Sequence, residues 1–321
     1  MLNRRILRIK VFQSLYSFYK SDNNELQSGI NNLMRTLTKM HELFICNLSF
    51  LIKLQELATE RIENNKTKFI PAEEDKNPNC KFINNIVFSK LSSNYELNKL
   101  ISAYKVSWAE QQKLIKKILI IIQGSIKYAE YMHNSENNFE EDKSFLTKIY
   151  KKYIYNNSSL IHFFEEANIH WGQDQYYIGS IILNFIKNLN DDWDEKSKLP
   201  EVFKNNYLAI EDSDEYFVKK LFEITVLKKQ EYEDVIEKYL QNWDIERVAF
   251  TDMIIIKMAI CEILNFPQIP IKPSINEYIE ISKSFSTPKS KIFINGVLDQ
   301  IIAHYKRNNM IEKYGRGLRE V

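Results

Sequence analysis

Hydrophobic side chains recur every three or four residues along most of the chain. The first clear example is the stripe of Leu7, Val11, Leu15 and Phe18 within residues 2–19. Because an α-helix completes a turn in 3.6 residues, side chains at this spacing lie on one face. The chain has no internal repeat and no convincing pair of alternating strands. The pattern therefore predicts an all-α protein whose amphipathic helices pack around a common interior.

Similar spacing in the middle of the chain predicts further helices. They cover residues 26–62, 94–132 (as one long helix or two), 143–155, 158–168, 174–189, 213–227, 230–241 and 246–264. A loop at 64–79, a polar turn at 134–141 and a boundary at Pro200 separate them.

The last part of the chain carries the clearest start and stop signals. Three prolines between residues 267 and 273 predict an extended connector. Ser274 lies three residues before Glu277, the capping-box spacing, which predicts a helix from there to about residue 285. Thr287 and Pro288 then resemble an N-cap and a first helical residue. They predict a last helix over 288–305, in which Gly296 permits close packing.

Composition narrows the class of protein. Of 321 residues, 44% are hydrophobic and 13% are aromatic, which excludes a chain without a packed core. Glycine and proline number only 7 each, fewer than a nucleotide-binding α/β enzyme or a turn-rich β protein normally uses. The three cysteines, Cys46, Cys80 and Cys261, are far apart and are expected to fill the core. No secretory leader or membrane-length apolar run is present, so a cytoplasmic protein without a membrane partner is expected.

Charge is distributed unevenly along the chain. The formal net charge is only +2, but the first 20 residues hold five basic residues and no acid. Residues 267–321 hold nine basic and five acidic residues, so the 246 residues between carry about −7. Two basic ends around an acidic middle favour a polyanionic partner more than the total suggests.

Motifs of common enzymes are absent. The chain has no GxGxxG, Walker A, HExxH or GxSxG sequence. His162 and His170 are eight residues apart and have no clear third partner for a metal. We therefore predict no catalytic residue, no metal and no cofactor, and a protein that is not an enzyme.

Two basic segments are candidate nucleic-acid contacts. Arg4 and Arg8 are four residues apart and share a helix face, with Arg5 beside them, so three guanidinium groups suit phosphate. The alternative is an ordinary basic leader. The second segment is Lys289, Ser290 and Lys291, at a helix N-terminus where the backbone favours an anion.

Phe293 follows the second basic segment within the first turns of that helix. It is placed to stack on an unpaired base, and the alternative is an ordinary core phenylalanine.

Several strings together resemble the NusB family of transcription antitermination factors. The opening helix matches in Arg4, Arg5, Arg8, Val11, Gln13, Leu15 and Tyr16. The carboxy-terminal part matches in Trp243–Arg247, Asp252–Ala259, Glu262, Ile269–Pro270, Ile275–Glu277, Glu280, Lys283 and Phe293–Asp299.

This resemblance implies a helical bundle of two packed subdomains and an RNA-binding function. The family binds the boxA element of ribosomal RNA transcripts together with the ribosomal protein NusE, within an antitermination complex of RNA polymerase. Carried over by position, the RNA-facing residues are Arg4, Arg5, Arg8, Lys289, Ser290, Lys291 and Phe293. The expected NusE-facing residues are Tyr16 and Asp252. Asn276, Glu277, Asn295 and Gly296 are expected to be structural, in capping, turn anchoring and close packing.

The match leaves a large part of the chain unaccounted for. Residues 1–20 correspond to the first helix and 211–307 to the remainder of the family fold, whereas 21–210 form a predicted helical insertion of unknown function. Residues 308–321 are predicted to be a mobile tail. Lys257 replaces a usual arginine, and Ser286 replaces a frequent glycine.

Two other classes of function remain open at this point. One is a helical protein–protein adapter in the transcription machinery with little RNA affinity of its own. The other is an enzyme, since the same fold precedes a ribosomal RNA cytosine methyltransferase domain in some proteins. That domain requires a glycine-rich loop and a catalytic cysteine downstream, for which this chain has no room. Assembly into a homodimer is also left open.

Overall fold

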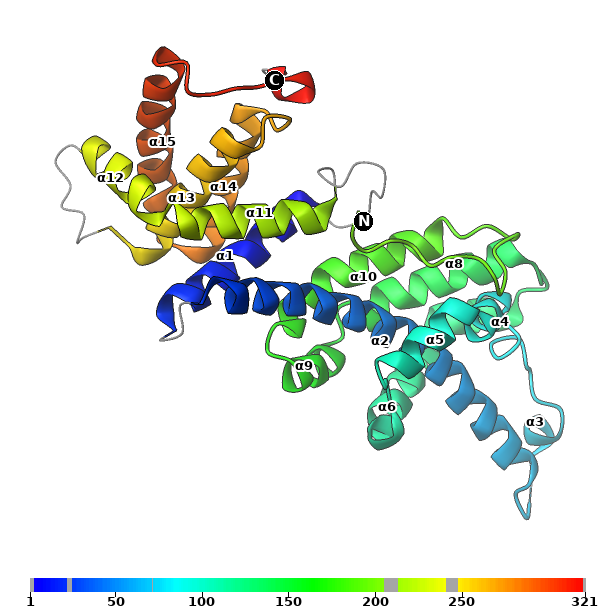
Figure 1. Cartoon of the computed structure of the whole chain (residues 1–321). Coiled ribbons are helices and arrows are strands. Elements are labelled where there is room, and N and C mark those ends of the chain that lie inside the picture. Colours follow the sequence, from blue (N-terminus) through cyan, green and yellow to red (C-terminus); the bar gives the residue numbers. More distant parts are fainter. Residues whose placement is uncertain (1–2, 22–24, 71, 205–212, 241–247, 320–321) are drawn as a thin grey trace. The chain divides into compact units, whose positions relative to one another are not determined.

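The regular structure of the chain is helical. The computed structural model describes residues 3–21, 25–70, 72–204, 213–240 and 248–319, and every regular element in these ranges is a helix (Figure 1). The all-α prediction is therefore confirmed. Among the described helices, none combines the length and apolar character needed to cross a membrane. Trp243–Arg247, the start of the helix predicted at 246 and the boundary predicted at 210 lie outside the described residues.

The chain divides into two compact units. Unit 1 comprises Thr38–Val202, and unit 2 comprises the described residues of Leu2–Leu37 and Phe203–Val321. The insertion predicted over 21–210 is thus longer at both ends than unit 1.

Unit 2 is assembled from both ends of the chain. Its helices are α1 (Arg4–Lys20), the first turns of α2 (Leu26–Lys66), α11 (Asp214–Leu227), α12 (Lys229–Tyr239), α13 (Phe250–Asn265), α14 (Ile271–Phe285), α15 (Ser290–Arg307) and the short η5 (Gly315–Leu318). α13 is the central helix and packs against α1, α11, α12, α14 and α15. All its residues from Ile254 to Ile263 are buried, including the charged Lys257 and Glu262, so neighbouring helices enclose it on every side.

The beginning of α2 belongs to unit 2 because of a close approach at Gly29. A Cβ atom at this position would lie 2.7 Å from the Phe222 ring and 2.8 Å from the Phe18 ring. These distances are shorter than van der Waals contact, so only glycine lets the helix lie this near the two aromatic rings.

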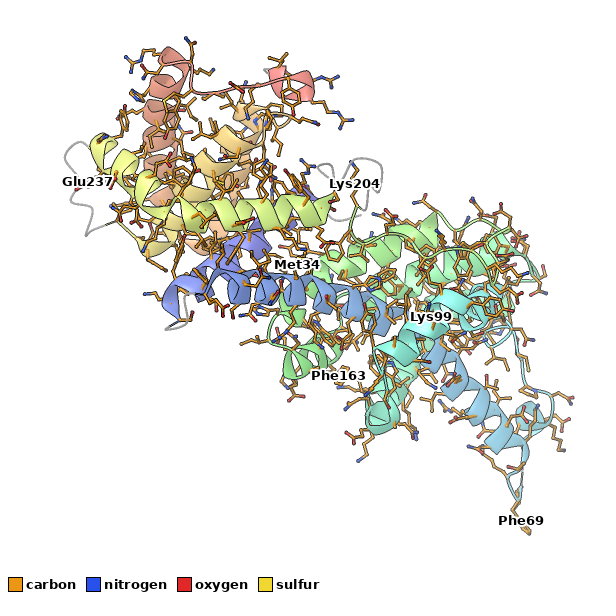
Figure 2. All side chains as sticks on the ribbon, in the orientation of Figure 1. Met34, Phe69, Lys99, Phe163, Lys204 and Glu237 are labelled. Atoms are coloured by element: carbon orange, nitrogen blue, oxygen red, sulfur yellow. The ribbon has the colours of Figure 1, made fainter. Side chains whose placement is uncertain are left out.

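Unit 1 consists of the remainder of α2 and a series of shorter helices. These are α3 (Glu73–Lys76), α4 (Ile86–Ser93), α5 (Tyr95–Ala103), η1 (Ala109–Gln111), α6 (Gln112–Gln123), α7 (Ile126–His133), α8 (Phe139–Ile149), the π-helical η2 (Tyr150–Ile154), α9 (Ser158–Ala167) and α10 (Trp171–Lys187). A buried polar network fixes its interior: Asn47 and Gln175 exchange amide hydrogen bonds of 2.9 and 3.0 Å, and the Tyr150 hydroxyl donates to Asn47. In the turn after α2, the Phe69 side chain is fully exposed (Figure 2).

Asparagine caps account for the helix boundaries that the hydrophobic pattern missed in unit 1. Asn85 and Asn94 accept hydrogen bonds from Val87 N and Leu97 N, so α4 and α5 begin as separate helices. The stretch 94–132 contains three α-helices rather than one or two. α8 begins inside the predicted turn, because Asn138 caps it through the Glu141 amide.

Two predicted helix starts in unit 2 were wrong. α14 begins at Ile271, so the connector ends at Pro270 and Pro273 lies in the first helical turn, where its missing N–H costs nothing. Ser274 is therefore inside the helix and is no cap; its hydroxyl donates to Pro270 O and to Glu262. α15 begins at Ser290, two residues after Pro288.

The interpretation of Gly296 was also wrong. A Cβ atom there would meet nothing within 4 Å, so no neighbouring helix requires a glycine. Asn276 is exposed within α14, and the Asn295 amide donates to Asp299 on the same helix, so neither side chain caps a helix or anchors a turn.

The tail packs against the connector before α14. Lys313 Nζ donates to Phe266 O at 3.0 Å and Tyr314 N to Pro267 O at 3.3 Å. A Cβ atom at Gly317 would lie 1.9 Å from Pro267 O, so this contact also requires glycine.

Candidate nucleic-acid interface

The first turn of α1 positions the three candidate arginines. The Asn3 side chain accepts a hydrogen bond from Arg5 N at 3.0 Å and so caps the helix one residue before Arg4. The three guanidinium groups nevertheless enter different environments.

Arg8 points into the core of unit 2. Its guanidinium makes two hydrogen bonds of 2.7 Å to the Glu262 carboxylate on α13, and both side chains are buried. The same carboxylate accepts hydrogen bonds from Ser274 Oγ at 2.6 Å and Tyr278 Oη at 2.9 Å. Four donors from α1 and α14 therefore converge on one buried acid, which ties α1, α13 and α14 together.

The protonation of this cluster follows from its neighbours. Burial alone would raise the pKa of Glu262. The charge of Arg8 and the hydrogen bonds from Arg8, Ser274 and Tyr278 outweigh burial and hold this pKa below its usual value. The cluster thus holds a stable carboxylate–guanidinium pair in the interior, and Arg8 presents no charge to solvent.

Arg5 forms the second ion pair of the helix, at the surface. Its Nε and one terminal nitrogen donate to the Glu277 carboxylate on α14 at 2.7 and 2.9 Å, while 42% of the Arg5 side chain stays exposed. The hydrogen bond that Arg5 donates to Glu277 raises the pKa of Arg5. Arg4 lies with its guanidinium 5.0 Å from the centre of the Phe217 ring, and no described carboxylate lies within ion-pair distance of it.

Ser290 is buried at the first residue of α15 and joins two helices. Its hydroxyl donates to Asp252 Oδ2 at 2.7 Å, and it lies 2.8 Å from Thr287 Oγ1 and 3.0 Å from Ser286 Oγ. Asp252 is in the first turn of α13 and is also buried. This hydroxyl cluster fixes the turn between α14 and α15, so that neither Ser290 nor Asp252 is open to a ligand.

The two residues that flank Ser290 lie at the surface, and Phe293 lies partly there. Lys289 and Lys291 are exposed, and no described acid pairs with either of them. Phe293 is half-buried and packs against the core with part of its ring. Packing in the core and stacking on a base are therefore compatible for Phe293, because one part of the ring packs inward and the rest reaches solvent.

Tyr16 lies at the other end of α1 from the arginines. Its side chain is 42% exposed, and its ring packs edge-on against Phe250, with the ring centres 5.5 Å apart. Phe250 is itself partly exposed at the start of α13, next to Thr251, whose hydroxyl lies 2.9 Å from Ser286 Oγ.

α1 and α14 bring these positions to one side of unit 2. Arg5 contacts Glu277 near the middle of α14, and Phe12 contacts Phe285 at its end, with ring centres 5.2 Å apart. Because α1 rises 1.5 Å per residue, the two contacts are about 10 Å apart along it. The Arg5–Glu277 ion pair, the turn before α15 and Tyr16 therefore follow one another along one side of α1.

The acids that hold the arginines were not predicted as their partners. Glu262 and Glu277 match the family pattern, but nothing near them in sequence pairs them with α1. A signal for Arg8 was present, since Leu7 and Val11 flank it in an apolar stripe and a buried arginine requires a buried acid.

Comparison of the sequence with known proteins identifies a family. The model of the NusB family matches residues 180–303, a range that begins within α10 and ends within α15. No solved structure matches the chain.

Curated relatives named transcription antitermination protein NusB match the same part of the chain. The protein of Salinibacter ruber is 41% identical over 102 residues, which is 32% of this chain and 64% of that protein. The protein of Chloroherpeton thalassium is 38% identical over 102 residues, which is 32% of this chain and 48% of that protein. The protein of Natranaerobius thermophilus is 34% identical over 122 residues, which is 38% of this chain and 88% of that protein. Since most of the last relative is covered at this identity, the chain belongs to the NusB family.

Proposed function

We propose that unit 2 is a transcription antitermination module that binds the boxA element of ribosomal RNA transcripts together with NusE, without catalysis. The observation that carries this proposal is the surface at the start of α15. Two exposed lysines without a described acidic partner, Lys289 and Lys291, flank a buried serine and precede a half-exposed aromatic ring at Phe293.

This surface supplies the two interactions that single-stranded RNA needs. The lysines neutralise phosphates and release counterions, whereas an aromatic face stacks on a base of any identity. Arg5, paired with Glu277 on α14, extends this surface along α1, and Arg4 lies beside it over Phe217 of α11. Arg8 and Ser290 act from below it, because they fix the helices that carry the exposed groups.

The proposed NusE contact centres on Tyr16. Tyr16 and Phe250 form a partly exposed aromatic pair, and such residues are enriched in protein interfaces. Asp252 is buried and supports this surface from within through its hydrogen bond with Ser290. The RNA and NusE surfaces adjoin each other, so one complex with RNA polymerase can use both.

One specific observation favours the alternative function, a protein–protein adapter. The guanidinium groups of Arg5 and Arg8 already bind carboxylates of this chain, so the arginine helix offers RNA less charge than its sequence suggests. An adapter would bind NusE or polymerase through Tyr16 and show no RNA affinity.

An RNA titration distinguishes the two functions. A fluorescent single-stranded boxA-like RNA is titrated with the full chain, alone and with purified NusE, and with a scrambled RNA as control. We expect tighter binding of the boxA-like RNA than of the scrambled RNA, with a further gain when NusE is present. Binding of NusE without preference for either RNA would support the adapter and contradict the proposal.

A further inference from the structure

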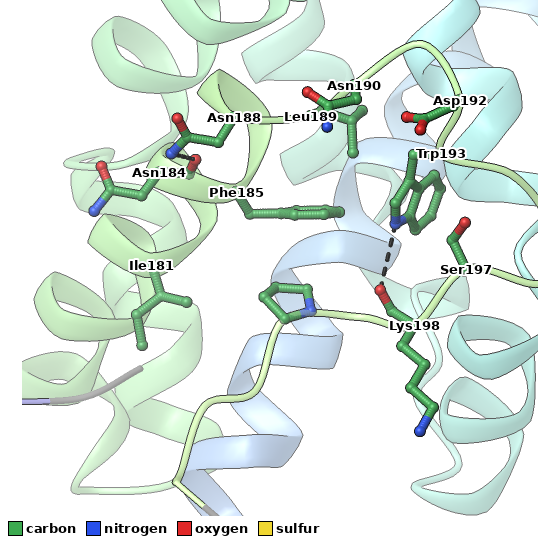
Figure 3. Close-up of a pocket in the computed structure, with 11 residues that line it drawn as sticks. Ile181, Asn184, Phe185, Asn188, Leu189, Asn190, Asp192, Trp193, Ser197 and Lys198 are labelled. Carbon is green, nitrogen blue, oxygen red and sulfur yellow. Dashed lines mark hydrogen bonds between the residues drawn. The ribbon is translucent and has the colours of Figure 1, made fainter.

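Unit 1 contains a pocket that the proposed RNA contacts do not use. It has a volume of about 560 Å³ and lies between the second half of α10 and the segment 188–200 that follows it (Figure 3). Phe185 and Trp193 form two of its walls, with ring centres 5.7 Å apart and ring planes at 69°. The two rings therefore form an aromatic corner of the pocket.

The loop that forms the pocket is held by hydrogen bonds from α4 and α5. Lys90 Nζ donates to Asp191 O at 2.6 Å and to Trp193 O at 2.9 Å. The Asn94 amide donates to Ser197 O at 2.8 Å, and Glu96 accepts from Leu199 N at 2.7 Å. These contacts fix the loop backbone before any ligand arrives, which lowers the entropic cost of binding.

The polar groups of the pocket favour a cation. Asp192 lines it, and among the described residues no hydrogen bond or ion pair engages this carboxylate. Asn184 and Asn190 also line the pocket, and their amide oxygens can act as further acceptors. Lys198 also lines the pocket, but its amine points away from the Trp193 ring (Figure 3).

The charged groups around the pocket also favour a cation. Of the acids in the segment 188–200, Asp191 lies 3.5 Å from Lys90 Nζ and Asp194 accepts from Ser197 Oγ, whereas Asp192 has no described partner. Asp192 is therefore the carboxylate left to bind a cationic side chain.

We propose that this pocket binds an arginine side chain of a partner protein. A guanidinium stacks on the face of tryptophan and at the same time forms two hydrogen bonds to a carboxylate. Trp193 supplies the face and Asp192 the carboxylate. The site makes unit 1 a protein-docking module, and it is independent of the RNA function of unit 2.

Nuclear magnetic resonance tests the site directly. The probe is Nα-acetyl-arginine amide, titrated into the ¹⁵N-labelled full chain while the Trp193 indole N–H signal is followed. Substitution Trp193→Phe identifies that signal by its loss. The neutral analogue Nα-acetyl-citrulline amide, which has nearly the same shape, is the ligand control. We expect a saturable shift for the arginine probe with a dissociation constant on the order of millimolar, and none for citrulline.

Two matched substitutions in the same loop distinguish binding in the pocket from a general effect of charge. Asp192→Asn removes a carboxylate that lines the pocket, whereas Glu195→Gln removes the same charge from a residue that does not line it. Both side chains are exposed, so folding is expected to be unaffected. Asp192→Asn should raise the dissociation constant about fivefold, as expected for one exposed ion pair, and Glu195→Gln should leave it within twofold.

Three results would overturn the proposal. One is the absence of a saturable shift with the arginine probe. Another is an equal effect of the two loop substitutions. The third is a larger shift with a short single-stranded RNA than with the arginine probe, which would make the pocket a base-binding site.

Discussion

The two basic segments of unit 2 look equivalent in sequence but differ in structure. At the start of α1, carboxylates of this chain bind two of the three guanidinium groups, one in the core and one at the surface. At the start of α15, both lysines are exposed and only the serine between them is engaged. A basic segment at the end of a helix can therefore either hold the fold together or form an exposed binding surface. The acids that pair with its side chains determine which of the two it does.

This difference assigns separate roles to residues that the family pattern groups together. Arg8 and Ser290 contribute to RNA binding through the stability of unit 2, whereas Lys289, Lys291 and Phe293 are placed for direct contact. Arg5 is intermediate, because its guanidinium is partly exposed but shared with Glu277.

The largest effect is expected from Arg8→Met. Removing one partner of a buried ion pair leaves the Glu262 carboxylate uncompensated, so unit 2 should lose about 3–5 kcal/mol of unfolding free energy. Chemical denaturation followed by circular dichroism measures the loss. Arg5→Met is the matched control and should cost about 1 kcal/mol or less, since its pair is exposed. Equal losses would contradict the distinction between the two arginines.

The buried Glu262 carboxylate should also make the stability of unit 2 depend on pH in the acidic range. The pKa of Glu262 is depressed in the folded chain, so its contribution is fully present above the unfolded value of 4.5 and is lost as pH falls through the folded value. Each unit of depression corresponds to about 1.4 kcal/mol. Glu262→Gln is less stable at neutral pH but should lack this part of the acid dependence. Parallel stability profiles below pH 4.5 for the variant and the wild type would argue against it.

Much of the fold could be predicted from the sequence because hydrophobic spacing is a local signal. α1, α9 and α11 were placed to within a few residues. The separate starts of α4 and α8 and the start of α14 were missed. Ser274 carried the spacing of a cap, yet its hydroxyl turns to Glu262, twelve residues earlier in the chain. The pairing of Arg8 with Glu262 spans 254 residues, and no local pattern encodes it.

The next effect concerns Phe293. Phe293→Leu keeps an apolar side chain against the core but removes the face that stacks on a base. RNA affinity should fall by about 1–3 kcal/mol while the melting temperature changes little. Fluorescence anisotropy with the boxA-like RNA measures the first quantity and thermal denaturation the second. A fall in stability with unchanged affinity would make Phe293 a core residue only.

The smallest predicted effect has the opposite sign. Glu277→Gln releases Arg5 from its ion pair and removes a negative charge from the proposed RNA surface, so RNA affinity should rise by about 0.5–1 kcal/mol. Glu280→Gln on the same helix is the control for charge alone. If both variants bind RNA as the wild type does, Arg5 lies outside the RNA contact.

The salt dependence of RNA binding tests the central claim most directly. The affinity of Lys289→Ala/Lys291→Ala is compared with that of Lys113→Ala/Lys116→Ala, which removes the same charge from exposed positions on α6 of unit 1. Two lost phosphate contacts on a single strand should reduce the slope of log affinity against log salt concentration by about 1.4. We expect this reduction for the α15 pair and an unchanged slope for the α6 pair. Equal slopes for both variants and the wild type would contradict the assignment of the RNA surface to the start of α15.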